Sequence, residues 1–508
     1  MCPYVRTVKT SSGATAVQIV YSSHRGSRDI EHLGSAHSSA EVELLKAAAR
    51  QRLAAGQGEL DLGLDTAAPG GPLPVTSSRM AHLWDALAHA YRVLGFAEAA
   101  GGDAVFAQLV LARIIEPTSK LDSARVLDET GISAPSYRTV LRRLPAYAKP
   151  AWRQRLSAAC ARHAGLGPAS LVLYDVSTLY FETDTGDGFR EPGFSKERRL
   201  DPQITIGLLT DASGFPLMVS AFEGNKAETK TMLPVIRAFL AAHRLPDVTV
   251  VADAGMISAA NQKEIEAAGL SFILGMRLPE VPYVVSQWRR EHPDEDIPDG
   301  HVFTQPWPAG PRGDRRDQVI YYQYRNDRAR RTLRGIGEQV AKAENAVAGR
   351  APIKRNRFIQ LSEGTHTVNR ELDAKARALA GIKGYITNLA ACPDDTPITA
   401  DFVIAAYHRL SGIEKSFRMS KHDLQARPVY HHQRDSIEAH LTIVFAGLAV
   451  SRWIEARTGW SIRKFVRTAR RYRTIEIQAG GHAITAADPL PDELRGALDR
   501  IHRSSGAH

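Results

Sequence analysis

The chain has 508 residues, which is long enough for about three domains of ordinary size. With 44% hydrophobic and 24% charged residues, its composition excludes wholesale disorder. The net charge of +10 favours a polyanionic partner, and three cysteines far apart in sequence exclude a disulfide framework.

No apolar leader or membrane-length apolar run is evident, so we expect a protein of the reducing cytoplasm, without a membrane partner. Residues 1–75 predict a small module that ends in a Gly/Pro-rich linker. The pattern over residues 80–165 is helical, and residues 123–144 predict two helices around a glycine turn. The second of these helices carries Arg138, Arg142 and Arg143. This arrangement is typical of a helix-turn-helix in a major groove, but also of a helical hairpin with a solvated basic face.

Residues 166–277 alternate between strand and helix patterns. Apolar runs predict strands at 170–174, 204–210, 216–221, 248–252 and 272–275. The hairpin signals come first and the helix–strand alternation follows, which indicates a mixed α/β sheet flanked by helices.

Two acids directly follow predicted strands: Asp175 after the first and Asp253 after the fourth. In α/β folds functional side chains gather outside the carboxyl edge of the sheet. Carboxylates there suit Mg²⁺, and two such ions can activate an attacking hydroxyl and stabilise the leaving oxygen of a phosphodiester. The alternative is that each Asp simply caps a turn or a helix.

Residues 278–395 interrupt the alternation, and we interpret them as an inserted subdomain. From Arg325 to Arg357 there are ten Lys or Arg against three Asp or Glu, enough for phosphate contact, although such a run is usually a solvated helix face. Residues 396–460 are helical again, and residues 461–508 predict a basic C-terminal tail with six basic residues between 461 and 473.

One helical stripe in the 396–460 region combines opposite charges. Tyr407, Glu414 and Lys421 are spaced by seven residues, about two helical turns, and Arg418 lies one turn after Glu414. This pattern is natural for a metal ligand beside a phosphate backbone, and a solvated, salt-bridged helix remains the alternative.

Together these segments resemble the DDE transposases of bacterial insertion sequences, in the group with a Tyr-x2-Arg-x3-Glu-x6-Lys motif. The resemblance covers about residues 1–460, and the matching segments are 173–182, 193–203, 222–228, 252–257, 413–418 and 421–430. It implies an RNase H-like catalytic core with an inserted β-rich subdomain and a helical N-terminal DNA-binding region. The motif's arginine position is Leu410 here, which leaves the role of that arginine open.

By position, the resemblance makes Asp175, Asp253 and Glu414 the catalytic, metal-binding acids. They would hold two Mg²⁺ ions, for which Mn²⁺ can substitute. The expected partners are double-stranded DNA, both inverted terminal repeats and target, and a second copy of the chain, with no small-molecule substrate. The expected DNA contacts are Tyr407, Arg418, Lys421, Lys196, Arg199, Arg138 and Arg142.

Three other classes compete with this interpretation. The first is a catalytically inactive DNA-binding relative, which would not need the three acids. The second is a Mg²⁺-dependent nuclease without strand transfer, which the sequence distinguishes poorly from a transposase. A zinc enzyme is disfavoured because the spacing of His422, His431, His432 and His440 fits no common site and Cys392 is distant.

Overall fold

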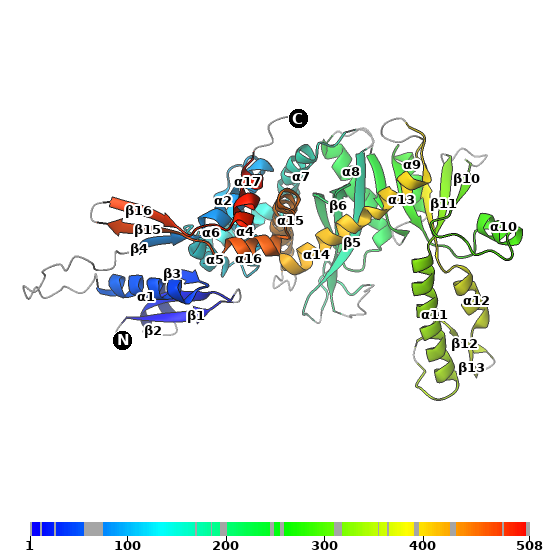
Figure 1. Cartoon of the computed structure of the whole chain (residues 1–508), viewed down its shortest axis with the longest axis horizontal. Coiled ribbons are helices and arrows are strands. Elements are labelled where there is room, and N and C mark those ends of the chain that lie inside the picture. Colours follow the sequence, from blue (N-terminus) through cyan, green and yellow to red (C-terminus); the bar gives the residue numbers. More distant parts are fainter. Residues whose placement is uncertain are drawn as a thin grey trace, which may run out of the picture.

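The architecture was analysed in a computed structural model of the chain. The structure describes residues 3–10, 13–24, 27–54, 75–167, 170–183, 185–193, 201–243, 248–254, 259–308, 317–353, 355–362, 365–390, 396–426, 433–479 and 482–503. The molecule is elongated, with a small N-terminal module at one end, a helical region in the middle and a large sheet at the other end (Figure 1). A helical arm projects from the edge of that sheet (Figure 1).

The N-terminal module has a core of its own. Three antiparallel strands, β1 (Tyr4–Lys9), β2 (Thr15–His24) and β3 (Ser27–Ala36), are covered by helix α1 (Ser39–Ala54). Alternate apolar side chains of β2 pack against the helix, as expected for a half-buried strand. The buried residues are Val17, Ile19, Ala36, Leu45 and Ala49.

The helical region surrounds the long helix α15 (Arg434–Thr458), which packs against α6 and α4. Within the described residues, α15 alone is long and apolar enough to span a membrane, but 89% of its most apolar window is buried in the fold. A core helix of a folded domain has these same properties. The other helices here are α2 (Ala81–Val93), α3 (Phe96–Ala99), α4 (Ala104–Ile115), α5 (Ser123–Thr130), α6 (Tyr137–Ala148) and α7 (Pro150–Ala164).

The predicted mixed sheet is confirmed, with eight strands in the order β7-β6-β5-β8-β9-β14-β11-β10. Only the β5–β8 and β8–β9 pairs are parallel. Helices α8 (Met232–His243) and α9 (Ala259–Ala267) complete the crossovers. The strands are β5 (Ser170–Tyr180), β6 (Gln203–Asp211), β7 (Pro216–Glu223), β8 (Val248–Ala252), β9 (Ser271–Met276), β10 (Val302–Trp307), β11 (Gln318–Tyr324) and β14 (Ile382–Thr387). One continuous apolar core joins this sheet to the helical region.

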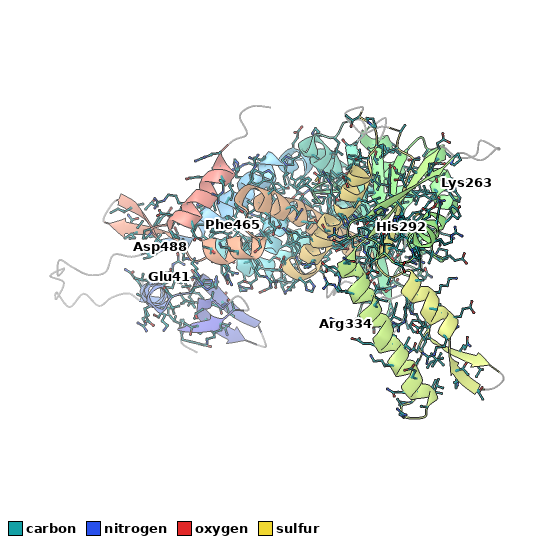
Figure 2. All side chains as sticks on the ribbon, turned by 45° about the vertical axis from the view of Figure 1, so that its right-hand side comes forward. Glu41, Lys263, His292, Arg334, Phe465 and Asp488 are labelled. Atoms are coloured by element: carbon teal, nitrogen blue, oxygen red, sulfur yellow. The ribbon has the colours of Figure 1, made fainter. Side chains whose placement is uncertain are left out.

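The 278–395 segment is less separate than we predicted, because β10, β11 and β14 extend the main sheet. The rest forms α10 (Tyr283–Glu291) and the arm, which consists of α11 (Asn326–Val347), α12 (Arg370–Ala378) and the hairpin of β12 (Ile359–Ser362) and β13 (Thr365–Val368). The arm has a small core around Ile336, Val340 and Phe358. Side chains such as Arg334 point outward from α11 (Figure 2).

Residues 461–508 are predicted to be a basic tail, but the described part, 461–479 and 482–503, folds against the rest of the chain. They form α16 (Ile462–Ala469), β15 (Thr474–Ala479), β16 (His482–Ala487) and α17 (Asp492–His502), and β15 also pairs with β4 (Val75–Arg79). The side chain of Phe465 is fully buried between helices (Figure 2). The buried Arg470 pairs with Glu116 at 2.6 Å and with Glu129 at 2.9 Å. The basic sequence is therefore partly a structural network and not a solvated tail.

Candidate active site

Two acids meet at the carboxyl edge of the parallel strand pair. The five residues of β8 are all buried, and the strand ends at Ala252, so Asp253 is the first residue beyond it. Tyr174 of β5 lies opposite Ala252, and Asp175 is the next residue. Contrary to our expectation, Asp175 does not end its strand, because β5 continues to Tyr180 by pairing with β6 alone. The two acids nevertheless stand side by side where the β5–β8 pairing stops.

Helix α13 (Ala400–His408) brings Tyr407 against Asp253. The buried phenol of Tyr407 donates a hydrogen bond to Asp253 Oδ1. Burial, the hydrogen bond and the Asp253 charge all raise the pKa of Tyr407, so the phenol stays a donor at working pH. Gly275 of β9 leaves room for it, since a Cβ there would lie 2.7 Å from the Tyr407 hydroxyl. The sequence predicts that Tyr407 contacts DNA, and the structure shows its hydroxyl bonded to Asp253.

Helix α14 (Leu410–Arg418) carries Glu414, whose side chain is exposed toward the same edge. The helix is held by the turn between β6 and β7. Ser416 Oγ donates to Gly214 O at 2.7 Å, and Gly214 has a φ of +83°. A Cβ on Gly214 would lie 2.6 Å from the carbonyl of Gly412 on α14. This close backbone approach fixes the position of Glu414 relative to the sheet.

These elements enclose one pocket of about 280 Å³. The residues that line it are Asp175, Asp253, Lys383, Tyr407, His408, Leu410, Ser411 and Glu414. Three carboxylates around one cavity are the oxygen donors that a hard divalent cation takes, so the donor set fits Mg²⁺. Within the described residues, no three acidic, His or Cys side chains form a ligand cluster by themselves. Water and substrate phosphate would have to supply further ligands.

Lys383 is a pocket residue that the sequence analysis missed. It lies on β14, more than a hundred residues from either Asp, and its Nζ is 4.2 Å from the centre of the Tyr407 ring. Burial lowers the pKa of Lys383, and the charges of Asp253 and Glu414 oppose that shift. The sequence does mark Lys383 as the one charged residue of the segment Ile382–Thr387.

The remaining predicted contacts lie away from this pocket or outside the described residues. Arg418 ends α14, and Lys421 lies on the π-helical turn Met419–Asp423; neither lines the pocket. The wider turn displaces Lys421 from the stripe predicted for a regular α-helix. Arg138 and Arg142 are exposed on α6, the second helix of the predicted helix-turn-helix. Lys196 and Arg199, like His431, His432 and Cys392, fall outside the described residues.

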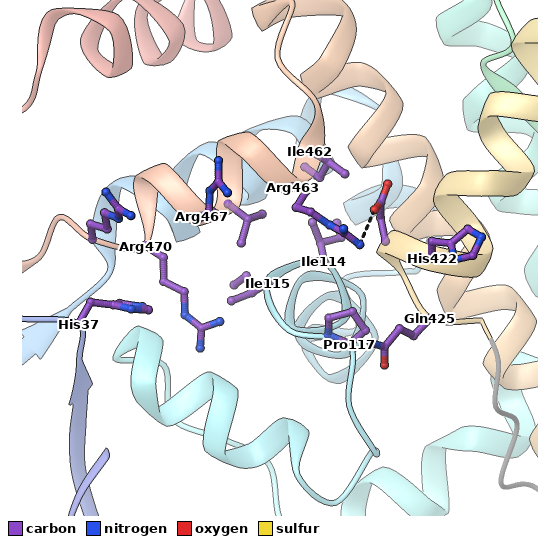
Figure 3. A pocket seen from close by; sticks show the side chains of 13 residues that line it. His37, Ile114, Ile115, Pro117, His422, Gln425, Ile462, Arg463, Arg467 and Arg470 are labelled. Carbon is purple, nitrogen blue, oxygen red and sulfur yellow. Dashed lines mark ion pairs between the residues drawn. The ribbon is translucent and has the colours of Figure 1, made fainter. Parts of the chain in front are cut away.

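A second pocket, of about 330 Å³, lies where α16 meets the end of the π-helical turn (Figure 3). We call it the arginine pocket. Arg463 pairs with Asp423 at 3.0 Å, and Arg470 points inward to its buried acids. Arg467 and Arg471 are exposed and have no side-chain partner among the described residues. The lining residues are His37, Ile114, Ile115, Pro117, His422, Asp423, Gln425, Ile462, Arg463, Val466, Arg467, Arg470 and Arg471.

Comparison with known proteins identifies a family. The family model described as "transposase DDE domain" matches residues 120–449. No curated protein matches the chain significantly. Among solved structures, the chain is similar to the piggyBac transposase in a synaptic complex with hairpin DNA. That similarity has a TM-score of 0.39 and 11% sequence identity, and it covers 76% of this chain and 70% of that one.

Proposed function

Because the chain belongs to the transposases with a DDE domain, we propose that it moves its own insertion sequence. It would bind the inverted terminal repeats, cut the DNA at the element's ends and join the freed 3′-hydroxyl to target DNA. The observation that carries this proposal is that Asp175, Asp253 and Glu414, which come from three separate elements, line one pocket at the carboxyl edge of the sheet.

The three acids would hold two Mg²⁺ ions, with Mn²⁺ as a substitute. Such a pair of ions, when bound, activates the attacking oxygen and stabilises the leaving oxygen of a phosphodiester. Tyr407 would orient Asp253 through its hydrogen bond. The contact between α14 and Gly214 would keep Glu414 at a fixed distance from the two Asp residues. No covalent protein–DNA intermediate is required.

We also propose that the strands β7-β6-β5-β8-β9 form an RNase H-like core. The arrangement that supports this is three antiparallel strands followed by two that run parallel to β5, with helices in the crossovers. The insertion would then comprise the arm and the three strands that extend the sheet. Of the domain boundaries predicted from the sequence, those of residues 1–75, 80–165, 166–277 and 396–460 remain part of this proposal.

DNA would contact several basic surfaces outside the acid pocket. We assign the reading of bases to Arg138 and Arg142 on α6, and phosphate contact to Arg418, Lys421, Lys196 and Arg199. Arg467 and Arg471 of the arginine pocket, which have no side-chain partner among the described residues, would contact phosphates in the same way. A dimer would bring both element ends together, and the working location would be the cytoplasmic nucleoid.

The test is excision of a plasmid-borne element with its native ends, which are found as repeats in the flanking DNA. We expect Asp253→Ala and Glu414→Ala to abolish excision and to retain binding of the ends. The matched control is Asp401→Ala, which removes an exposed acid from α13 outside the pocket and should excise normally. Excision by either pocket variant would refute the assignment of the acids.

The same assay separates the alternatives. A wild-type protein that binds the ends but never cuts would be an inactive DNA-binding relative. Cutting without capture of the 3′-hydroxyl end in target DNA would indicate a nuclease.

A further inference from the structure

Lys383 supplies a positive charge inside the acid pocket. It is partly buried on β14, which lies between β9 and β11 in the sheet. Among the described residues that line the pocket, Lys383 is the single lysine or arginine. A strand inside a sheet is a rigid support, so the position of this charge is well defined.

The ammonium group of Lys383 is held in place but is not neutralised. Nζ lies 4.2 Å from the ring centre of Tyr407 and 5.9 Å from that of Tyr385, which are cation–π distances. Asp253 and Glu414 are near enough to act on it electrostatically. In the described part of the chain, however, Lys383 forms no ion pair with any carboxylate. The ammonium therefore keeps its hydrogen-bonding capacity for another anion.

Among the described residues, no other lysine or arginine lines the pocket. The position where the motif has arginine is Leu410, an apolar side chain on the pocket wall. Arg328 lies nearby, but its Nη1 is bound to the carbonyl oxygens of Gln323 at 3.2 Å and Gly381 at 3.3 Å. A phosphate that enters among three carboxylates meets strong repulsion, which one fixed ammonium reduces.

We propose that Lys383 binds a non-bridging oxygen of the DNA phosphate that is cut. Lys383 on β14 would then supply the positive charge that is missing from α14, where Leu410 stands at the motif's arginine position. This inference rests on the proposed function, because it takes the pocket to be the place of cutting. Lysine suits the task as a compact charge with three donors, since the negative charge on the phosphate oxygens grows as the bond breaks.

The experiment compares two DNA duplexes that carry the terminal repeat. One has a natural phosphodiester at the cut position and the other has a neutral methylphosphonate there. Binding to each is measured by fluorescence anisotropy in EDTA, so that no metal ion contributes. The readout is the ratio of the two affinities, which isolates the charge of that single phosphate.

We expect Lys383→Met to weaken binding of the phosphodiester duplex about tenfold relative to the methylphosphonate duplex. This is the effect of losing one charge-assisted hydrogen bond. Asp253→Ala should shift it the opposite way, because a repelling charge is lost. The control Lys375→Met removes an exposed lysine that pairs with Glu280 at 3.5 Å, and it should leave the ratio unchanged. Should Lys383→Met fail to fold, Lys383→Gln gives the same comparison.

An unchanged ratio in the Lys383 variants, with terminal-repeat binding intact, would overturn this inference and leave the proposed function standing. A wild-type protein that does not prefer terminal-repeat DNA over random DNA would overturn both.

Discussion

The hydrogen bond from Tyr407 to Asp253 gives the sharpest test of how the pocket works. Tyr407→Phe removes the hydroxyl and keeps the ring, which packs edge-to-face on Tyr385 with 5.0 Å between ring centres. A hydrogen bond to a charged group contributes about 1.5–3 kcal/mol, and about 1.4 kcal/mol is a factor of ten. Loss of a partner that orients a metal-binding carboxylate costs about 10–100-fold in metal affinity. We therefore expect cleavage at limiting Mg²⁺ to fall about 10- to 100-fold.

The assay is cleavage of a terminal-repeat duplex while Mg²⁺ is titrated. In the Tyr407→Phe protein the half-maximal Mg²⁺ concentration should rise, and excess Mg²⁺ should restore part of the rate. Binding of the duplex without metal should not change. The control is Tyr385→Phe, the same chemical change in the neighbouring ring, whose hydroxyl is bonded to no described carboxylate. A wild-type rate and a wild-type Mg²⁺ dependence in Tyr407→Phe would refute the role of this hydrogen bond.

Three further changes probe the scaffold. Glu116 and Glu129 are buried and pair with both Arg125 and Arg470. Arg470→Met leaves Arg125 as the one described cation between these two carboxylates, so urea unfolding should show a loss of about 3–5 kcal/mol, against less than about 0.5 kcal/mol for the exposed Arg467→Met. Gly214→Ala forces α14 away from the turn between β6 and β7, so DNA cleavage should fall while binding of the ends persists. Unchanged cleavage would contradict the close contact between Gly214 and α14. Burial lowers the pKa of Lys120 from 10.5 to about 7. Between pH 7 and pH 10.5, Lys120 is protonated in the unfolded chain but not in the folded one. The free energy of unfolding should therefore rise from pH 7 to pH 9, and Lys120→Met should flatten that rise. Urea titrations at each pH measure both.

The elements around the acids were predictable because their signals are local. The apolar run of β8 ends directly before Asp253, and a helical pattern around Tyr407 and Glu414 is readable within fifteen residues. The single helical stripe predicted there is divided in the structure, because α13 ends at His408 and α14 begins at Leu410. The register of β5 was not predictable. Its strand continues past Asp175 because β6 supplies a partner for residues that β8 does not reach, and pairing lengths of that kind depend on both strands.

The errors at the C-terminal end have a different cause. Arg470 and Arg473 are buried, but their partners lie hundreds of residues earlier: Glu116 and Glu129 for Arg470, and Ser78 for Arg473, at 2.6 Å from its Nε. A local count of charges cannot show such partners. The signal that was available is the apolar spacing Ile462, Phe465, Val466 and Ala469, which marks one buried face of α16.

Under the proposed function, the charge distribution would require DNA binding and cutting to use separate surfaces. Three carboxylates with one lysine make the acid pocket itself unattractive to a polyanion. Favourable contacts must therefore come from surfaces such as the arginine pocket and the exposed face of α6, whose contribution depends on counterion release and falls with salt. The binding energy gained there would hold one phosphate against the acids, where the proposed metal ions and Lys383 would act on it. On this reasoning, raising the salt concentration should weaken DNA binding far more than it slows cutting in the bound complex.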